Sequence, residues 1–152
     1  MCNLLRETVN EEDAVTFHVS NYGGCFDSAA TLVNAIKDCK GETKAVVNAP
    51  SYSAATMITL ACDEVEIKPY AFLMFHNFSS RTGGKGGELK ANVHNTERVI
   101  HSMMRDLYDP FLSQKEINDI FNDKDVYVHW DDKNLINRLN KHHNITKIEI
   151  DE

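Results

Sequence analysis

The chain has 152 residues, a formal net charge of −7 and 42% hydrophobic residues. This length suits one domain with a sizeable core, and an acidic chain without a basic tract is not expected to bind nucleic acid. The four cysteines show no paired spacing, which fits a reducing cytoplasm, and neither a signal peptide nor a membrane span is predicted.

The first third of the chain predicts a strand, a glycine turn, a helix and a second strand. Residues 15–20 alternate apolar and polar side chains, which is typical of a half-buried strand, and Gly23 and Gly24 follow in a turn. Apolar residues then recur at helical spacing over residues 27–36. Residues 44–49 predict the second strand.

Ser53 lies where the second strand is expected to turn into a helix. Residues 54–61 are almost wholly apolar and rich in alanine, which predicts a buried helix with Ser53 at its N-terminus. The unpaired N–H groups and the dipole of such a helix end favour a developing negative charge. Two further strands are predicted at residues 64–68 and 70–75, and the second of them ends at His76.

A glycine-rich loop and a long helix are predicted next. Residues 79–87 are polar and rich in glycine but lack the P-loop spacing, so we interpret them as a flexible connector. From about residue 87 to 110, apolar residues fall at alternating steps of four and three, which indicates an amphipathic helix. This seam consists of Leu89, Val93, Thr96, Ile100, Met103 and Leu107. His94 and His101 are expected on a solvated face.

The last part of the chain predicts two short helices and two strands. Residues 113–116 form a capping box that opens a helix through Phe121, and Asp125 begins a strand. Residues 132–139 predict a small helix and residues 145–150 a closing strand. Because strands and helices alternate throughout, we predict an α/β fold.

Ser53, His76 and Asp125 are candidates for a catalytic triad. A serine hydroxyl is a poor nucleophile at neutral pH, so it needs an imidazole to accept its proton and an acid to orient that imidazole. Asp123 is an alternative to Asp125, which is preferred because it directly precedes the strand and would be better fixed. In the competing interpretation, Ser53 is only a small residue that lets a buried helix pack closely.

Several features together carry a resemblance to a known family. They are the turn at residues 21–24 before a helix, Ser53-Ala54-Ala55-Thr56-Met57, the strand ending in Met74-Phe75-His76-Asn77, the glycine-rich loop with its long helix, Asp125 and a Cys62-Asp63 pair. In order and spacing, these features resemble the Clp protease proteolytic subunit over about residues 4–139. The resemblance is nearest to shorter relatives encoded by bacteriophages.

The resemblance implies a fold and an assembly. The fold is a ClpP/crotonase-like spiral of strand-strand-helix repeats, in one domain over residues 1–152, with the long helix as a handle between rings. The assembly is a homo-oligomer with rings of seven that can stack in pairs. The implied partners are an AAA+ unfoldase, through which ATP would act indirectly, and a peptide or protein substrate. No cofactor or metal of its own is implied, and the location is the cytoplasm, that of the host for a phage-encoded chain.

The resemblance also implies a serine endopeptidase that works through an acyl-enzyme. By position, the nucleophile, base and orienting acid are Ser53, His76 and Asp125. Substrate-binding backbone is implied at Gly23, Gly24 and Ala54, where the N–H groups of the last two form the oxyanion hole. A glycine turn suits this role because the backbone must approach the substrate carbonyl closely.

Two other functions are alternatives to the serine endopeptidase, and the short N-terminus carries an expectation of its own. One alternative is a catalytically silent ring or scaffold protein, and the other is a crotonase-like acyl-CoA enzyme, whose chemistry relies on paired acids. Only about twenty residues precede Gly23, where the family has a first strand and an axial segment. We therefore expect either a shortened version of a longer reading frame or a neighbouring subunit that covers the exposed strand edge.

Overall fold

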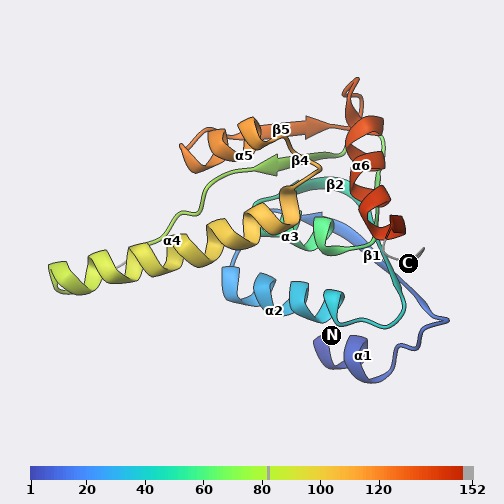
Figure 1. Cartoon of the computed structure of the whole chain (residues 1–152), viewed down its shortest axis with the longest axis horizontal. Helices are drawn as coiled ribbons and strands as arrows, with labels where there is room; N and C mark the ends of the chain where they lie inside the picture. Colours follow the sequence, from blue (N-terminus) through green and yellow to red (C-terminus); the bar gives the residue numbers. More distant parts are fainter. Residues whose placement is uncertain (82, 149–152) are drawn as a thin grey trace.

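The predicted strands assemble into one five-stranded mixed sheet in the computed structural model, which describes residues 1–81 and 83–148 (Figure 1). Strand β1 (Ala14–Asn21) lies parallel to β2 (Glu42–Tyr52). On its other side, β2 pairs in parallel first with β3 (Glu64–Ile67) and then, at its end, with β4 (Phe72–Phe75). Strand β5 (Val126–His129) runs antiparallel to β4. The chain is therefore an α/β protein, as its sequence predicts.

Helices α2 (Phe26–Lys37) and α3 (Ala54–Ala61) lie together below the sheet in Figure 1 and supply much of the core. Helix α3 is buried almost all round, which is why its sequence lacks a polar face. The short helix α1 (Cys2–Glu7) packs on α2 and buries Leu5. No sequence pattern predicted α1.

The long helix α4 (Gly86–Tyr108) begins within the predicted loop, and its first part extends away from the sheet (Figure 1). Its buried residues all lie between Ile100 and the end of the helix, where Ile100 and Leu107 enter the core. Towards the start of the helix Val93 is 43% exposed, and residues 90–99 are exposed throughout. Only the last part of the predicted seam is therefore buried within the described chain, and residues 90–99 are left exposed.

The C-terminal elements confirm one prediction and overturn another. Helix α5 (Gln114–Phe121) opens with the predicted capping box of Ser113 and Glu116. Helix α6 (Leu135–Ile148) includes residues 145–148, so the predicted closing strand is wrong there, and residues 149–150 lie outside the described part. A growing helix adds one hydrogen bond per residue without a neighbouring strand, which outweighs a short alternating pattern.

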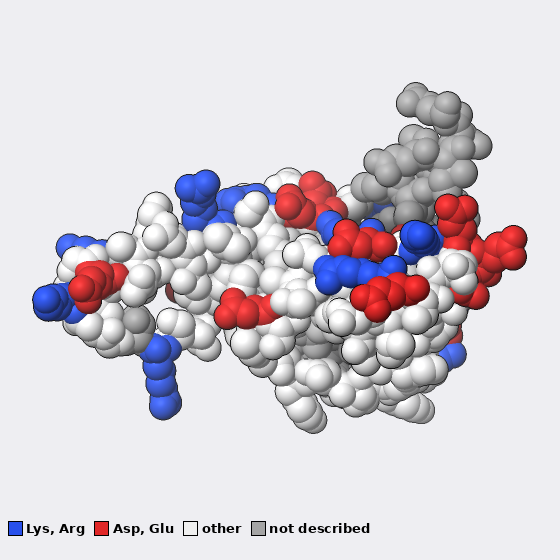
Figure 2. All heavy atoms as spheres, turned by 90° about the horizontal axis from the view of Figure 1, so that it is seen from below, with Lys and Arg blue, Asp and Glu red and all other residues white. Residues whose placement is uncertain are grey.

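In Figure 2, charged side chains of both signs lie side by side in the upper part of the view, whereas the lower part of the body is largely uncharged. On the sheet, Lys44 forms an ion pair with Glu66 at 3.0 Å, and Lys68 contacts the same carboxylate. This face therefore presents no broad patch of one sign. Among the described helices, none is long and apolar enough to cross a membrane.

Candidate active site

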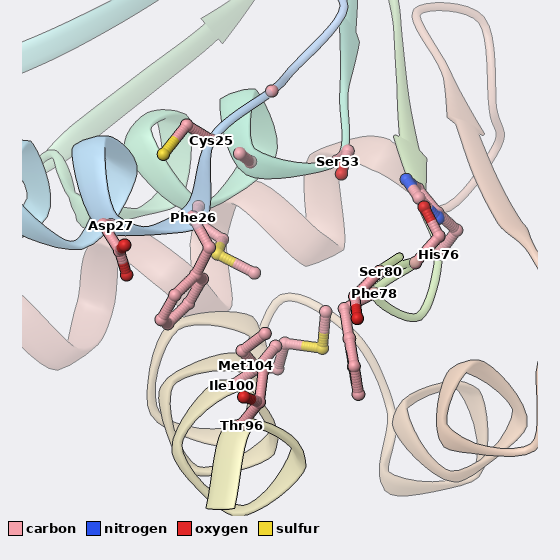
Figure 3. A pocket seen from close by; sticks show the side chains of 14 residues that line it. Cys25, Phe26, Asp27, Ser53, His76, Phe78, Ser80, Thr96, Ile100 and Met104 are labelled. Carbon is pink, nitrogen blue, oxygen red and sulfur yellow. The ribbon is translucent and has the colours of Figure 1, made fainter. Parts of the chain in front are cut away.

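The candidate residues meet at one edge of the sheet. Because β1, β2 and β4 are parallel, their C-terminal ends share an edge, and Gly24, Ser53 and His76 each follow one of these strands. Strand β5 runs the other way, so Asp125, just before it, reaches the same edge. Loops at the carboxyl ends of parallel strands are the usual location of ligand sites in α/β sheets. A cavity of about 390 Å³ opens here, and its lining includes Gly24, Ser53, Ala54 and His76 (Figure 3).

The backbone of Ser53 is strained, with φ 55° and ψ −125°. Such a conformation costs a residue other than glycine on the order of 1–3 kcal/mol and persists only where surrounding contacts enforce it. Those contacts are present: the Ser53 N–H donates to the Met74 carbonyl at 2.8 Å, and its carbonyl accepts from the N–H and the hydroxyl of Thr56 at 2.9 and 2.7 Å. The turn from β2 into α3 is therefore a sharp elbow that holds Ser53 in place.

The Ser53 hydroxyl is left free for chemistry. Serine at the start of a helix normally accepts a hydrogen bond from the first turn, but Ser53 makes no such capping bond to α3. Its side chain is half-buried and lines the cavity. A strained serine at a strand-to-helix turn, with its hydroxyl exposed, is the arrangement of a nucleophile elbow.

His76 lies next to Ser53 across the β2–β4 pair. The pairing of Tyr52 with Met74 and the bond from Ser53 to the Met74 carbonyl bring the ends of the two strands together. Figure 3 shows Ser53 and His76 on one side of the cavity, opposite Ile100 of α4. Within the described residues, no hydrogen bond joins His76 to Ser53 or to Asp125. Catalytic hydrogen bonds often tighten only when substrate binds.

Asp125 and Asp123 have different positions relative to His76. The last ladder pair between β4 and β5 joins Phe75 to Val126, and Asp125 is the next residue beyond it. Asp125 is exposed and is not among the described residues that line the cavity. Asp123 accepts a hydrogen bond from the Asn77 side chain at 2.8 Å instead. Asp123 is thus engaged by Asn77, and the assignment of Asp125 as the partner of His76 stays a prediction.

The glycine turn packs against the Ser53 elbow. Gly23 has φ +86°, and a Cβ atom there would lie 2.6 Å from the Tyr52 carbonyl oxygen and 2.8 Å from Ser53 Cβ, so no larger residue fits. Gly24 has φ +147° and open space around it. The N–H groups of Gly24 and Ala54 donate no hydrogen bond to any described residue, and both residues line the cavity. They can therefore stabilise an oxyanion.

The cavity also contains residues that no sequence pattern indicated. Cys25 lines it at the start of α2, where the nearby N–H and hydroxyl of Ser28 lower the pKa of its thiol. The rest of the lining combines apolar residues with Asp27, Ser79, Ser80 and Thr96; the apolar ones are Phe26, Met57, Phe78, Ile100 and Met104. These residues come from four separate segments, so only the fold brings them together.

His101 does not lie on a solvated face, which corrects the sequence-based expectation. It is half-buried, its Nε2 lies 3.0 Å from Asn77 Oδ1, and its ring stacks on Phe121 of α5 with centroids 3.9 Å apart. Burial lowers the pKa of its imidazole. The prediction failed because α5 packs against α4 at this point. His94, seven residues earlier in the same helix, is exposed as expected.

Comparison with known proteins does not assign a family or a function to the chain. No protein-family model matches the chain, and no curated protein matches it significantly. Nowhere in residues 1–81 and 83–148 do three His, Cys, Asp or Glu side chains gather so as to hold a metal ion. The function is therefore inferred from the fold and the cavity.

Proposed function

We propose that the chain is a serine peptidase of the Clp proteolytic type, with the spiral fold and handle helix of that family. The observation that carries the proposal is the Ser53 elbow: a strained backbone and an unused hydroxyl in a cavity shared with His76. Strain of this size at a single serine is expected where it positions a reacting group. Helix α4 corresponds to the handle.

In the proposed reaction, Ser53 attacks the carbonyl carbon of a peptide bond while His76 accepts the hydroxyl proton. The carbonyl oxygen becomes an oxyanion and is stabilised by the N–H groups of Gly24 and Ala54. His76 then gives its proton to the leaving amine, which breaks the C–N bond and leaves an acyl group on Ser53. Water, deprotonated by His76, hydrolyses this ester and restores the enzyme. Asp125 would orient the imidazole.

The experiment is hydrolysis of fluorogenic peptides by wild-type chain and by Ser53→Ala. We expect Ser53→Ala to lower kcat by several orders of magnitude, because removal of a triad nucleophile leaves only residual catalysis. Ser51→Ala is a matched control. Ser51 lies two residues before Ser53, is fully buried and forms a hydrogen bond with the Thr59 hydroxyl. Equal turnover by wild type and Ser53→Ala would refute the assignment.

A catalytically silent ring or scaffold protein is the second candidate. It is favoured by one observation, the lack of a hydrogen bond between His76 and either Ser53 or Asp125 among the described residues. A folded, assembled wild-type chain that neither cleaves peptides nor reacts with a serine-directed probe would establish this alternative. A crotonase-like enzyme is less well supported, since the described lining of the cavity holds a single carboxylate, that of Asp27.

A further inference from the structure

Asn77, directly after His76, sits at the centre of a hydrogen-bond group that the proposed triad does not use. Its Nδ2 donates to Asp123 Oδ1 at 2.8 Å, and its Oδ1 accepts from the Phe78 N–H at 3.0 Å and lies 3.0 Å from His101 Nε2. We call Asn77, Asp123 and His101 the clamp. Its three residues come from the end of β4, the turn before β5 and helix α4.

The amide orientation within the clamp follows from its partners. An ionised carboxylate only accepts hydrogen bonds, so the Asn77 nitrogen must face Asp123. The amide oxygen then faces His101, which must donate from Nε2. Both the nitrogen and the oxygen of the amide are thus hydrogen-bonded, and none of these bonds reaches the cavity, whose described lining contains His76 and Phe78 but not Asn77.

The clamp lies where the backbone ladder ends. The ladder between β4 and β5 stops at Phe75 and Val126, so no ladder pair holds His76 and Asp125 opposite each other. Beyond His76 and Asp125, the bond from Asn77 to Asp123 links the segment that follows β4 to the segment that precedes β5. His76 and Asp125 are therefore flanked by the Phe75–Val126 ladder pair on one side and by the Asn77–Asp123 hydrogen bond on the other.

We infer that Asn77 is a positioning residue, which together with Asp123 and His101 holds His76 against Asp125 and ties the catalytic strand end to helix α4. The inference rests on the proposed function for its effect on catalysis. The inferred effect on the position of His76 does not depend on whether the chain cleaves peptides.

Paired substitutions test the clamp because amide and carboxylate can exchange places. Asn77→Asp sets two carboxylates against each other, whereas Asn77→Asp with Asp123→Asn restores a donor opposite an acceptor and the wild-type net charge. Asp123→Asn alone replaces the charged acceptor of Asn77 by a neutral amide oxygen and should lower kcat less than Asn77→Asp does. Asn77→Ala removes the clamp without adding charge. The control is Asn122→Ala in the same turn, which loses one side-chain bond to the Asn118 carbonyl.

We expect Asn77→Asp and Asn77→Ala to lower kcat on the order of 10²-fold, since small misplacements of catalytic groups have effects of this size, with KM little changed. The double variant should recover most of the loss, and Asn122→Ala should cleave like wild type. Wild-type kcat in both Asn77 variants, or a double variant no better than Asn77→Asp, would overturn the inference. Thermal melting of each variant separates these results from loss of the fold.

A second readout keeps the test independent of peptidase activity. The imidazole C–H signals of His76 in an NMR spectrum should change in Asn77→Asp, in the sense seen for Asp125→Ala, and return in the double variant. His76 signals unchanged in Asn77→Asp would overturn the clamp. An inactive wild type with signals that follow this pattern would refute the proposed function and support the clamp.

Discussion

At the scale of single residues, the strained backbone of Ser53 supports its proposed role as a nucleophile. The apolar run after Ser53 predicts a helix N-terminus, and the structure has one there. The positive φ of Ser53 could not be predicted, because it results from tertiary contacts with Met74 and from the close approach of Gly23. The same holds for the clamp, whose members are distant in sequence.

The identity of the third triad member is testable at this scale. Asp125→Asn should lower kcat by about 10⁴-fold, as expected when the group that orients the base is lost. Asp123→Asn should have a small effect, because Asn suits the left-handed backbone of this residue, which has φ 59°, and still accepts from Asn77. The opposite ranking of the two variants in steady-state kinetics would make Asp123 the acid.

At the scale of elements, an ion pair joins α5 to α6. Glu116 accepts from Arg138 Nη2 at 2.7 Å and Nη1 at 3.0 Å while it caps α5 through Ser113. These bonds, chiefly those from Arg138, lower the pKa of Glu116 to about 2. The capping box was readable from the sequence, but its second use by Arg138 was not, because the predicted helix at residues 132–139 had no assigned neighbour.

This ion pair predicts a pH dependence of stability. The pKa of Glu116 is lower in the folded chain than in the unfolded one, so its contribution is fully present above about pH 4.5 and is lost as the pH falls towards 2. After allowance for solvent screening, Glu116→Gln should lower the free energy of unfolding by roughly 1–2 kcal/mol at pH 7. Urea unfolding should show the two proteins converging near pH 2, whereas Glu11→Gln, an exposed control, should follow wild type throughout. A constant difference at all pH values would contradict this account.

Sequence patterns predicted the helices and strands well where the apolar residues followed one spacing, either helical or alternating. Strands β1 to β5 and helices α2 to α5 were all anticipated, whereas α1 was missed and residues 145–148 were assigned to a strand. Both errors lie near the chain ends, where few neighbours constrain the local pattern. The long helix was found, but its burial could not be, since the packing of α4 depends on which elements lie beside it.

At the scale of the whole molecule, the first part of α4 is exposed in the single chain. A helix segment without tertiary contacts is marginal in water, so we propose that residues 86–99 pack against a second copy. Leu89 and Val93 lie four residues apart on one stripe of this segment. Substitution of Met103 and Leu107, the other end of the predicted seam, would instead disturb the fold, because Leu107 is buried.

Light scattering tests the assembly. Wild type should be an oligomer, and Leu89→Asp with Val93→Asp should yield smaller species of unchanged helical content. Asn92→Asp with Asn95→Asp adds the same charge at exposed positions of the same helix and should leave the oligomer intact. A wild-type chain that is monomeric at every concentration would refute self-assembly, and dissociation by both pairs would show that charge alone is responsible.

Labelling by a fluorophosphonate, followed by mass-spectrometric location of the adduct, tests the central claim most directly. This probe reacts with a serine only when a base activates its hydroxyl, so it reports the Ser53–His76 pair without any assumption about the peptide substrate. We predict one adduct on wild type, located at Ser53, and none on Ser53→Ala or His76→Ala. No adduct on the folded, assembled wild type, or equal labelling of Ser53→Ala, would contradict the assignment of this cavity as a serine-peptidase site.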